Sequence, residues 1–314
     1  MTGVPTSVVI GLSAVVVAIC DGDAVVLTLR FPNEELQGLP FGPFDPEGHR
    51  TFELALRAFV KAQTRFDLGY VEQLYTFGDK GRDAPLADMG AGAARVISVG
   101  YLGLAPAALD GHSAASGWQA WNRFFPYEDW REGRPGSLVA IEAALRAWAT
   151  TPEQLARARL LFALDGAPWN EERVLERYEL LYEAGLVHEA ARDRGEAQPV
   201  SLPPTGEPMI SDHRRILGTA LSRLRGKLKY RPVVFELMPE AFTLSALQRA
   251  VEAIAGVPLH KQNFRRALER AELVEGLGRM DAETGGRPAE LFRFRREILA
   301  ARPVSGLSLP LLRD

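Results

Sequence analysis

The N-terminal half alternates between hydrophobic patterns of two periods, which predicts both strands and helices. Val8–Cys20 and Ala24–Arg30 are rich in β-branched residues, and the turn Asp21-Gly22-Asp23 between them indicates a hairpin. From Thr51, which suits an N-cap, apolar side chains recur at helical spacing, so we expect a helix with one apolar face to about Thr64. The segments that complete this half are a Gly- and Pro-rich loop at 38–48, a strand at Leu68–Phe77, a polar loop at Gly78–Gly92 and a strand at Arg95–Leu104.

One helix among four strands predicts an α+β fold in which the helix packs on a mixed sheet. Residues 105–137 lack a clear period and should be irregular. They are unusually aromatic, and such a cluster could line a ligand pocket or a dimer contact, although core packing is its commoner role. Its aromatic residues are Trp118, Trp121, Phe124, Phe125, Tyr127 and Trp130. The helices expected after it lie near Ser137–Ala149, Pro152–Leu164 and Glu171–Ala184.

The last third of the chain has the element order of a winged helix-turn-helix. Residues 192–212, which contain four prolines and two glycines, should form an interdomain linker before it. Thr243 suits the N-cap of a helix at Leu244–Ala255, and Gly256-Val257-Pro258 breaks the chain before a second helix at Lys261–Ala271. The other expected elements are a helix from Asp212 to about Lys229, a strand at Val233–Leu237, and two strands at Leu273–Gly278 and Leu291–Phe294 joined by the turn-rich stretch Asp281–Pro288.

Charge divides unevenly between the two halves. Residues 1–211 hold 18 Lys and Arg against 28 Asp and Glu, a net −10, whereas residues 212–314 hold 19 against 12, a net +7. A basic C-terminal third favours a module that binds nucleic acid, although drift in surface composition would give the same asymmetry.

The second helix of the predicted helix-turn-helix has a polar first turn. Phe264 and Leu268 should face the core, which leaves cations and amides on the exposed arc. Such side chains read base edges in the major groove of double-stranded DNA or bind its phosphates. The two C-terminal strands form the wing, and its tip, Gly285-Gly286-Arg287-Pro288, carries an arginine suited to the minor groove or to a phosphate. The candidate DNA-binding residues are Thr243, Ser245, Lys261, Gln262, Asn263, Arg265, Arg266 and Arg287. The alternative is a winged helix that makes only protein contacts.

Composition restricts the class of protein further. Hydrophobic residues make up 46% of the chain, enough for a sizeable core, and the single cysteine, Cys20, fits a reducing compartment. The longest apolar run, Val8–Cys20, is shorter than the roughly 20 residues that a membrane-spanning helix needs. We therefore expect a cytoplasmic protein without a membrane partner.

Two stretches of the chain resemble a known family. The first is Gly42–Phe66 followed by Gly69–Asp79, in which the run Glu-Gln-Leu-Tyr-Thr-Phe-Gly-Asp at 72–79 is quite specific; the second comprises Phe242–Gln248, Lys261–Arg266 and Gly286–Ala289. Together they resemble the Nudix-like and winged-helix domains of the Nudix-related transcriptional regulators of NAD metabolism. The resemblance covers about 40–105 and 212–296. From this resemblance and the composition of the linker we predict a Nudix-like α/β/α sandwich with an aromatic and helical insertion at 1–190, a linker at 191–211, a winged-helix domain at 212–300 and a tail at 301–314.

The same resemblance implies a function. We expect a homodimeric repressor of genes for NAD synthesis or salvage that binds a palindromic operator, because a two-fold protein reads a two-fold site. No resident cofactor is expected. The effector would be ADP-ribose or another NAD-related nucleotide, including NADP or ATP. Its phosphates need cations and its base needs aromatic faces, so the candidate effector-binding residues are Arg30, Phe31, Tyr75, Phe77 and Arg82.

The helix at 52–64 lacks the glutamates with which an active Nudix hydrolase holds its cations. With Thr64 aligned to the usual Thr, the paired glutamates of the motif become Ala62 and Gln63, and a shift by one residue does not restore them. Glu53 precedes Arg57 by four residues and should form a surface ion pair with it. The sequence therefore predicts neither a catalytic nor a metal site. The alternatives are a pyrophosphohydrolase that uses Glu47, Glu53 or Asp79, and a protein-interaction adaptor.

Overall fold

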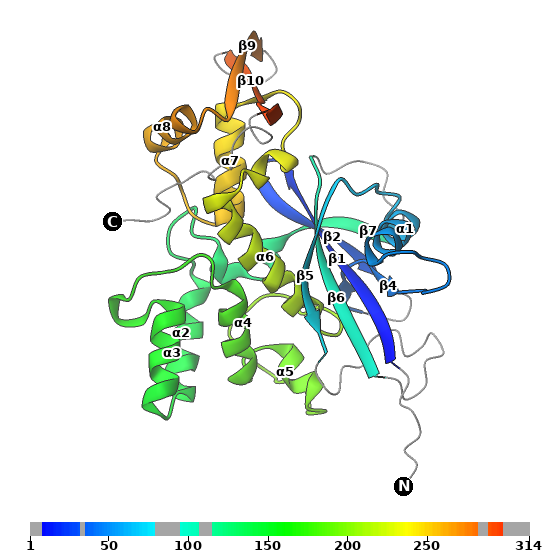
Figure 1. The fold of residues 1–314 in the computed structure, drawn as a ribbon. Helices are drawn as coiled ribbons and strands as arrows, with labels where there is room; N and C mark the ends of the chain where they lie inside the picture. Colours follow the sequence, from blue (N-terminus) through cyan, green and yellow to red (C-terminus); the bar gives the residue numbers. More distant parts are fainter. Residues whose placement is uncertain (1–7, 32–34, 79–94, 107–114, 282–287, 298–314) are drawn as a thin grey trace.

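The computed structural model describes residues 8–31, 35–78, 95–106, 115–281 and 288–297. Within these residues the larger sheet has the strand order β3-β2-β1-β6-β5, with β4 added to β1 and β7 added to β2 (Figure 1). β1 and β6 run parallel and the other pairs are antiparallel, so the sheet is mixed. The strands are β1 Val8–Cys20, β2 Asp23–Arg30, β3 Gln37–Gly38, β4 Phe41–Pro43, β5 Tyr70–Phe77, β6 Arg95–Leu104 and β7 Ser116–Ala120.

β1 is the central strand, and both of its faces are buried from Gly11 to Ala18. On one face its side chains pack against α1 (Phe52–Thr64) through Ala55, Leu56 and Val60. On the other face they pack against a larger core that includes α6 (His213–Tyr230). Figure 1 shows α1 and α6 on opposite sides of the sheet. This arrangement confirms the predicted α/β/α sandwich and the predicted helix, whose N-cap Thr51 accepts a hydrogen bond from the Leu54 amide.

The segment expected to be irregular contains a strand. β7 pairs with β2 from Leu29↔Ser116 to Val25↔Ala120, and short 3₁₀ turns follow at Trp121–Arg123 and Pro126–Glu128. Likewise, the expected loop at 38–48 contributes to β3 and all of β4. Both predictions failed because these short strands gain their hydrogen bonds from distant partners, which no local pattern reveals. The aromatic side chains that pack in the core here are those of Trp121, Phe124, Phe125 and Tyr127.

A helical layer follows β7 and lies beside α6 (Figure 1). The helices are α2 Ser137–Trp148, α3 Pro152–Phe162, α4 Val174–Glu183 and α5 His188–Asp193, of which α5 was not predicted. The proline-containing stretch after α5 packs against the protein, with Thr205, Met209 and Ile210 buried. The Ile210 amide donates to the Gln37 carbonyl, 3.0 Å away. The domain boundaries stay predictions.

The C-terminal third has the predicted order of a winged helix. After α6 come α7 (Leu244–Ala255) and α8 (Lys261–Ala271), and a small sheet has the order β8-β10-β9. Its strands are β8 Phe242–Thr243, β9 Val274–Asp281 and β10 Ala289–Phe294. The strand predicted at Val233–Leu237 is wrong: this stretch is a 3₁₀ helix. A short, continuously apolar run does not distinguish the two structures, and here it follows Pro232 and places Phe235 flat against Phe294, with ring centroids 4.1 Å apart.

None of the helices in the described ranges is long and apolar enough to cross a membrane.

Candidate nucleic-acid interface and effector region

α8 is amphipathic. Phe264 and Leu268, four residues apart, are each 1% exposed and pack into the core formed with α7. The other residues between positions 261 and 266 are exposed, as the spacing predicts: Lys261, Gln262, Asn263, Arg265 and Arg266. Three of these side chains are cations and two are amides, so the face can donate hydrogen bonds to base edges and to phosphates.

The cations of this face are available to an anionic ligand. Within the described part of the chain, Lys261, Arg265 and Arg266 form no ion pair with a carboxylate. By contrast, two cations at the end of β10 are paired: Arg293 pairs with Glu275, and Arg295 with Glu297 at 3.4 Å. The exposed face of α8 therefore gathers three cations that no carboxylate among the described residues pairs with.

The turn before α8 and the cap of α7 fix how the face is presented. Gly256 ends α7 in the left-handed region at φ +71°, where an L side chain is strained. The Thr243 hydroxyl accepts a hydrogen bond from the Ala246 amide at 3.1 Å, and its side chain is buried. Thr243 is thus an N-cap as predicted, whereas neighbouring Ser245 is exposed. The predicted contact Arg287 lies outside the described residues.

The candidate effector residues differ in exposure. Arg30 is exposed at the end of β2, and Phe31 is half-buried with its ring 4.8 Å from that of Phe41. On β5, Tyr75 is 61% exposed, while Phe77 is 3% exposed. Their rings lie 5.3 Å apart. Arg82 lies outside the described residues.

Phe77 faces the layer formed by α6. A Cβ built on Gly100 would lie 3.2 Å from Phe77 Cε2 and 3.3 Å from Ile216 Cγ2, so the three residues meet where β5, β6 and α6 pack. Phe77 is therefore part of the core, and Arg30 and Tyr75 have the most accessible side chains among the described effector candidates.

The polar side chains of α1 at the positions of the Nudix motif form hydrogen bonds and an ion pair within this protein. The predicted Glu53–Arg57 ion pair is confirmed at 2.8 Å, and Arg57 also donates to the Gly69 carbonyl at 3.0 Å. Gln63, at a position of the paired glutamates, donates to the Phe41 carbonyl at 2.7 Å. Among the described residues no three His, Cys, Asp or Glu side chains gather where they could hold a metal ion. Asp79, one of the alternative carboxylates, lies outside those residues.

Two buried ionic clusters were not predicted from the sequence. Arg177 and Arg225 bind Glu128, and Arg214 binds Glu189, all with side chains no more than 3% exposed. The partners are scattered along the chain and form no motif. The available signal was weak: the two α6 arginines stand on the same helical face as its buried leucines.

Comparisons with known proteins give three findings. Residues 234–294 match the family model of the NrtR DNA-binding winged helix domain. An ADPR responsive transcriptional repressor NtrR of Acinetobacter baylyi is 40% identical over 83 residues, which cover 26% of this chain and 33% of that relative. The chain thus spans about a third of the length of this curated relative.

The fold of the chain is also similar to those of solved structures. The NrtR of Shewanella oneidensis, crystallised with a 27mer DNA, has a TM-score of 0.53 and 21% identity over 97% of this chain and 98% of that one. A MutT/nudix family protein from Enterococcus faecalis has a TM-score of 0.55 and 13% identity over 94% and 89%. These likenesses confirm the predicted Nudix-like fold, and the family model confirms the predicted winged helix.

Proposed function

We propose that this chain belongs to the NrtR family and is a transcriptional repressor that binds operator DNA through α8 and the wing. The observation that carries the proposal is the uncompensated cationic and amide face of α8, within a segment that matches that family's DNA-binding domain. A helix of this kind fits the major groove, where its first turns meet base edges. The protein would act as a homodimer on a palindromic operator of genes for NAD synthesis or salvage.

The Nudix-like half would bind the effector. ADP-ribose is the first choice because the Acinetobacter relative carries the description ADPR responsive. Arg30 and Tyr75 could supply a cation for a phosphate and an aromatic face for a base. An effector that changes operator affinity does so through a coupling free energy of typically about 1–3 kcal/mol, or roughly 5- to 150-fold.

The proposal includes the absence of Nudix hydrolysis by α1. The positions that would bear its paired glutamates hold Ala62 and Gln63, and Gln63 is bound to the Phe41 carbonyl. Without a carboxylate cluster on α1, this helix would not hold the divalent cations that polarise a pyrophosphate. Turnover of ADP-ribose that requires Mg²⁺ or Mn²⁺ and is abolished by Glu53→Gln would contradict this part.

The test is fluorescence-anisotropy binding of the full chain to DNA upstream of its own gene and of NAD-biosynthesis genes. A scrambled duplex of equal length is the control, at one fixed salt concentration, with and without ADP-ribose, NAD, NADP and ATP. Specific binding that one nucleotide alters supports the proposal. Binding no tighter than to the scrambled duplex contradicts it.

Variants of α8 sharpen this test. If α8 reads bases, Gln262→Ala or Arg265→Ala should each weaken specific binding by about 1–3 kcal/mol and relax specificity at one position. Arg159 is a matched control because it is exposed on α3, far from α8 in Figure 1. Arg159→Ala should leave operator affinity unchanged. Equal losses in Arg265→Ala and Arg159→Ala would argue against a specific interface on α8.

A further inference from the structure

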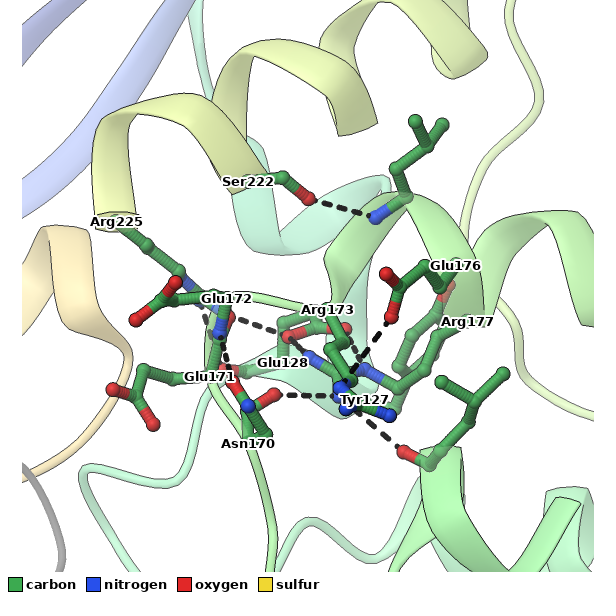
Figure 2. A network of polar contacts seen from close by, with 12 residues as sticks. Tyr127, Glu128, Asn170, Glu171, Glu172, Arg173, Glu176, Arg177, Ser222 and Arg225 are labelled. Carbon is green, nitrogen blue, oxygen red and sulfur yellow. Dashed lines mark hydrogen bonds and ion pairs between the residues drawn. The ribbon is translucent and has the colours of Figure 1, made fainter. Parts of the chain in front are cut away.

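The turn of the helix-turn-helix rests on a buried ionic network. Glu128 comes from the 3₁₀ turn after β7, Arg177 from α4 and Arg225 from α6, as Figure 2 shows. Arg177 binds both carboxylate oxygens of Glu128, at 2.5 and 2.8 Å, and Arg225 binds Oε2 at 2.6 Å. The three side chains are 0–3% exposed. One carboxylate thus joins two guanidinium groups from different helices.

The same network holds the end of α7. Arg225 Nε donates to the Ile254 carbonyl at 2.9 Å, and the Trp130 amide donates to the Gly256 carbonyl at 2.6 Å. A Cβ on Gly256 would overlap the Glu128 carbonyl oxygen and would lie 2.5 Å from Arg225 Nη2. The backbone at 254–256 therefore lies directly against the network, at the start of the turn that leads into α8.

The chain segment that carries Glu128 also forms a strand in the sheet of the Nudix-like half. Residues 116–120 form β7, whose pairing with β2 begins at Leu29↔Ser116, next to Arg30. Farther along the same segment, Arg131 binds Asp23 Oδ1 at 2.7 Å and donates to the Gly22 carbonyl at 3.2 Å, in the β1–β2 turn. Residues 116–131 thus connect β2, which ends at the effector candidate Arg30, with the turn before α8.

The geometry of the network favours one discrete arrangement. The two guanidinium groups also donate to the carbonyls of Leu161, Asn170 and Glu171, so a shift of Glu128 would leave several buried polar atoms unpaired. Burial lowers the pKa of Arg225, and the charge of Glu128 opposes that effect. Removal of the carboxylate would leave two buried cations next to the turn without their counter-charge.

We propose that Glu128 is a positioning residue that sets the orientation of α7 and α8 relative to the sheet, and that through it the effector domain alters operator affinity. The second half of this statement rests on the proposed function, whereas the first does not. Glu128 touches neither DNA nor effector in this scheme; it acts through Arg225 and the backbone at 254–256.

Glu128→Gln in the full chain tests the proposal, because the substitution keeps the shape of the side chain and removes its charge. Glu189→Gln is the matched control: Glu189 is also buried and bound to an arginine, Arg214, which donates to the Phe124 carbonyl of the same segment. Among the contacts of the described residues, this pair has none with the turn after α7. If Glu128→Gln does not fold, Arg225→Lys replaces it, since lysine keeps a cation but lacks the fork that reaches both Glu128 and Ile254.

The first measurement is the distance between spin labels on Cys20 and on Arg270→Cys, an exposed position of α8, by double electron–electron resonance. We expect a narrow distribution in the parent and in Glu189→Gln, and a shifted or broader one in Glu128→Gln. Equal distributions in all three would overturn the positioning role. This result does not depend on DNA or effector.

The second measurement is operator affinity with and without ADP-ribose, at a temperature where every variant is folded. Glu128→Gln should lower the effector-induced change in affinity by about fivefold or more, within the range of typical couplings, with ADP-ribose binding itself unchanged by calorimetry. An unchanged coupling, or an equal loss in Glu189→Gln, would overturn the role in transmission. A parent protein that binds no operator would instead refute the proposed function, and the label distances would still decide the role of Glu128.

Discussion

The buried pair Glu189–Arg214 allows a sharp prediction about stability. Arg214 is 0% exposed and donates to Glu189 Oε2 at 3.2 Å, to the Phe124 carbonyl at 3.0 Å and to the Thr205 carbonyl. Glu189 is 1% exposed and accepts the Met209 amide at 3.1 Å. The pair therefore joins α5 and α6 to the proline-containing stretch that precedes α6.

The magnitude follows from what each substitution leaves behind. Glu189→Gln leaves a buried guanidinium without its counter-charge, and breaking a buried pair in this way costs about 3–5 kcal/mol. Arg214→Met leaves the carboxylate unpaired and also two carbonyls without their donor, each of which costs about 1–3 kcal/mol. We expect Arg214→Met to be the more destabilising variant. The double variant should cost clearly less than the sum of the two, because it no longer buries an unpaired charge.

The assay is urea denaturation followed by circular dichroism, together with tryptic cleavage after Arg194, which is exposed next to the stretch that Arg214 holds. Arg214→Met should lower the midpoint and speed the cleavage. The control is the solvent-exposed pair Arg157–Glu183, at 2.7 Å, where Glu183→Gln should cost no more than about 1 kcal/mol. If Glu189→Gln were as mild as this control, or if the two costs were additive, the argument from burial would be wrong.

Three further predictions concern the cap of α7, the contact between β5 and α6, and the turn before α8. Thr243→Ala should destabilise the protein by about 0.5–2 kcal/mol in thermal melts through loss of the N-cap, and Thr243→Ser should restore it. Burial raises the pKa of Glu72, but the hydrogen bonds from Lys227 and Tyr70 and the charges of Lys227 and Arg223 together outweigh that effect, so the pKa lies below the ordinary 4.5. The stabilisation is therefore present above pH 4.5 and lost as the pH falls below it, and Glu72→Gln should flatten this loss in melts across pH. Gly256→Ala should lower the melting temperature more than Gly166→Ala: both glycines have positive φ, at +71° and +77°, but of the two only the Cβ at Gly256 would meet neighbouring atoms among the described residues. Equal effects would show that backbone strain alone matters.

The helix-turn-helix was predictable because its information is local. Phe264 and Leu268 recur at helical spacing, Thr243 precedes α7 as a cap, and Gly256 ends it, so the helix bounds and the exposed face of α8 follow from the chain itself. The same holds for α1 and for the Glu53–Arg57 ion pair: the cap, the apolar spacing and the two charges that determine them all lie within a few residues of one another.

What escaped prediction depends on distant partners. β7 is a strand only because β2 offers it an edge, and its own sequence, Ser-Gly-Trp-Gln-Ala, has no strand pattern. Val233–Leu237 has a strand's composition, but its side chains fill the core beneath the wing, and a 3₁₀ helix places them there. The network around Glu128 combines residues about 50 and 100 positions apart, a relation that no spacing within one element encodes.

The way α6 is anchored suggests which part of the molecule can transmit a change at the effector region. Near its start, Ile216 packs where Phe77 and Gly100 meet, and near its end Lys227 binds Glu72 of β5. A helix held to one sheet at both ends can tilt only if both contacts break. The segment 121–130 is bound to α6 by Arg214 at the Phe124 carbonyl and by Arg225 at Glu128, and the Trp130 amide joins it to the turn at Gly256. We therefore expect an effector-induced change to reach α8 along this segment with Glu128 still bound to Arg225, and to shift the backbone at 254–256 that this pair contacts.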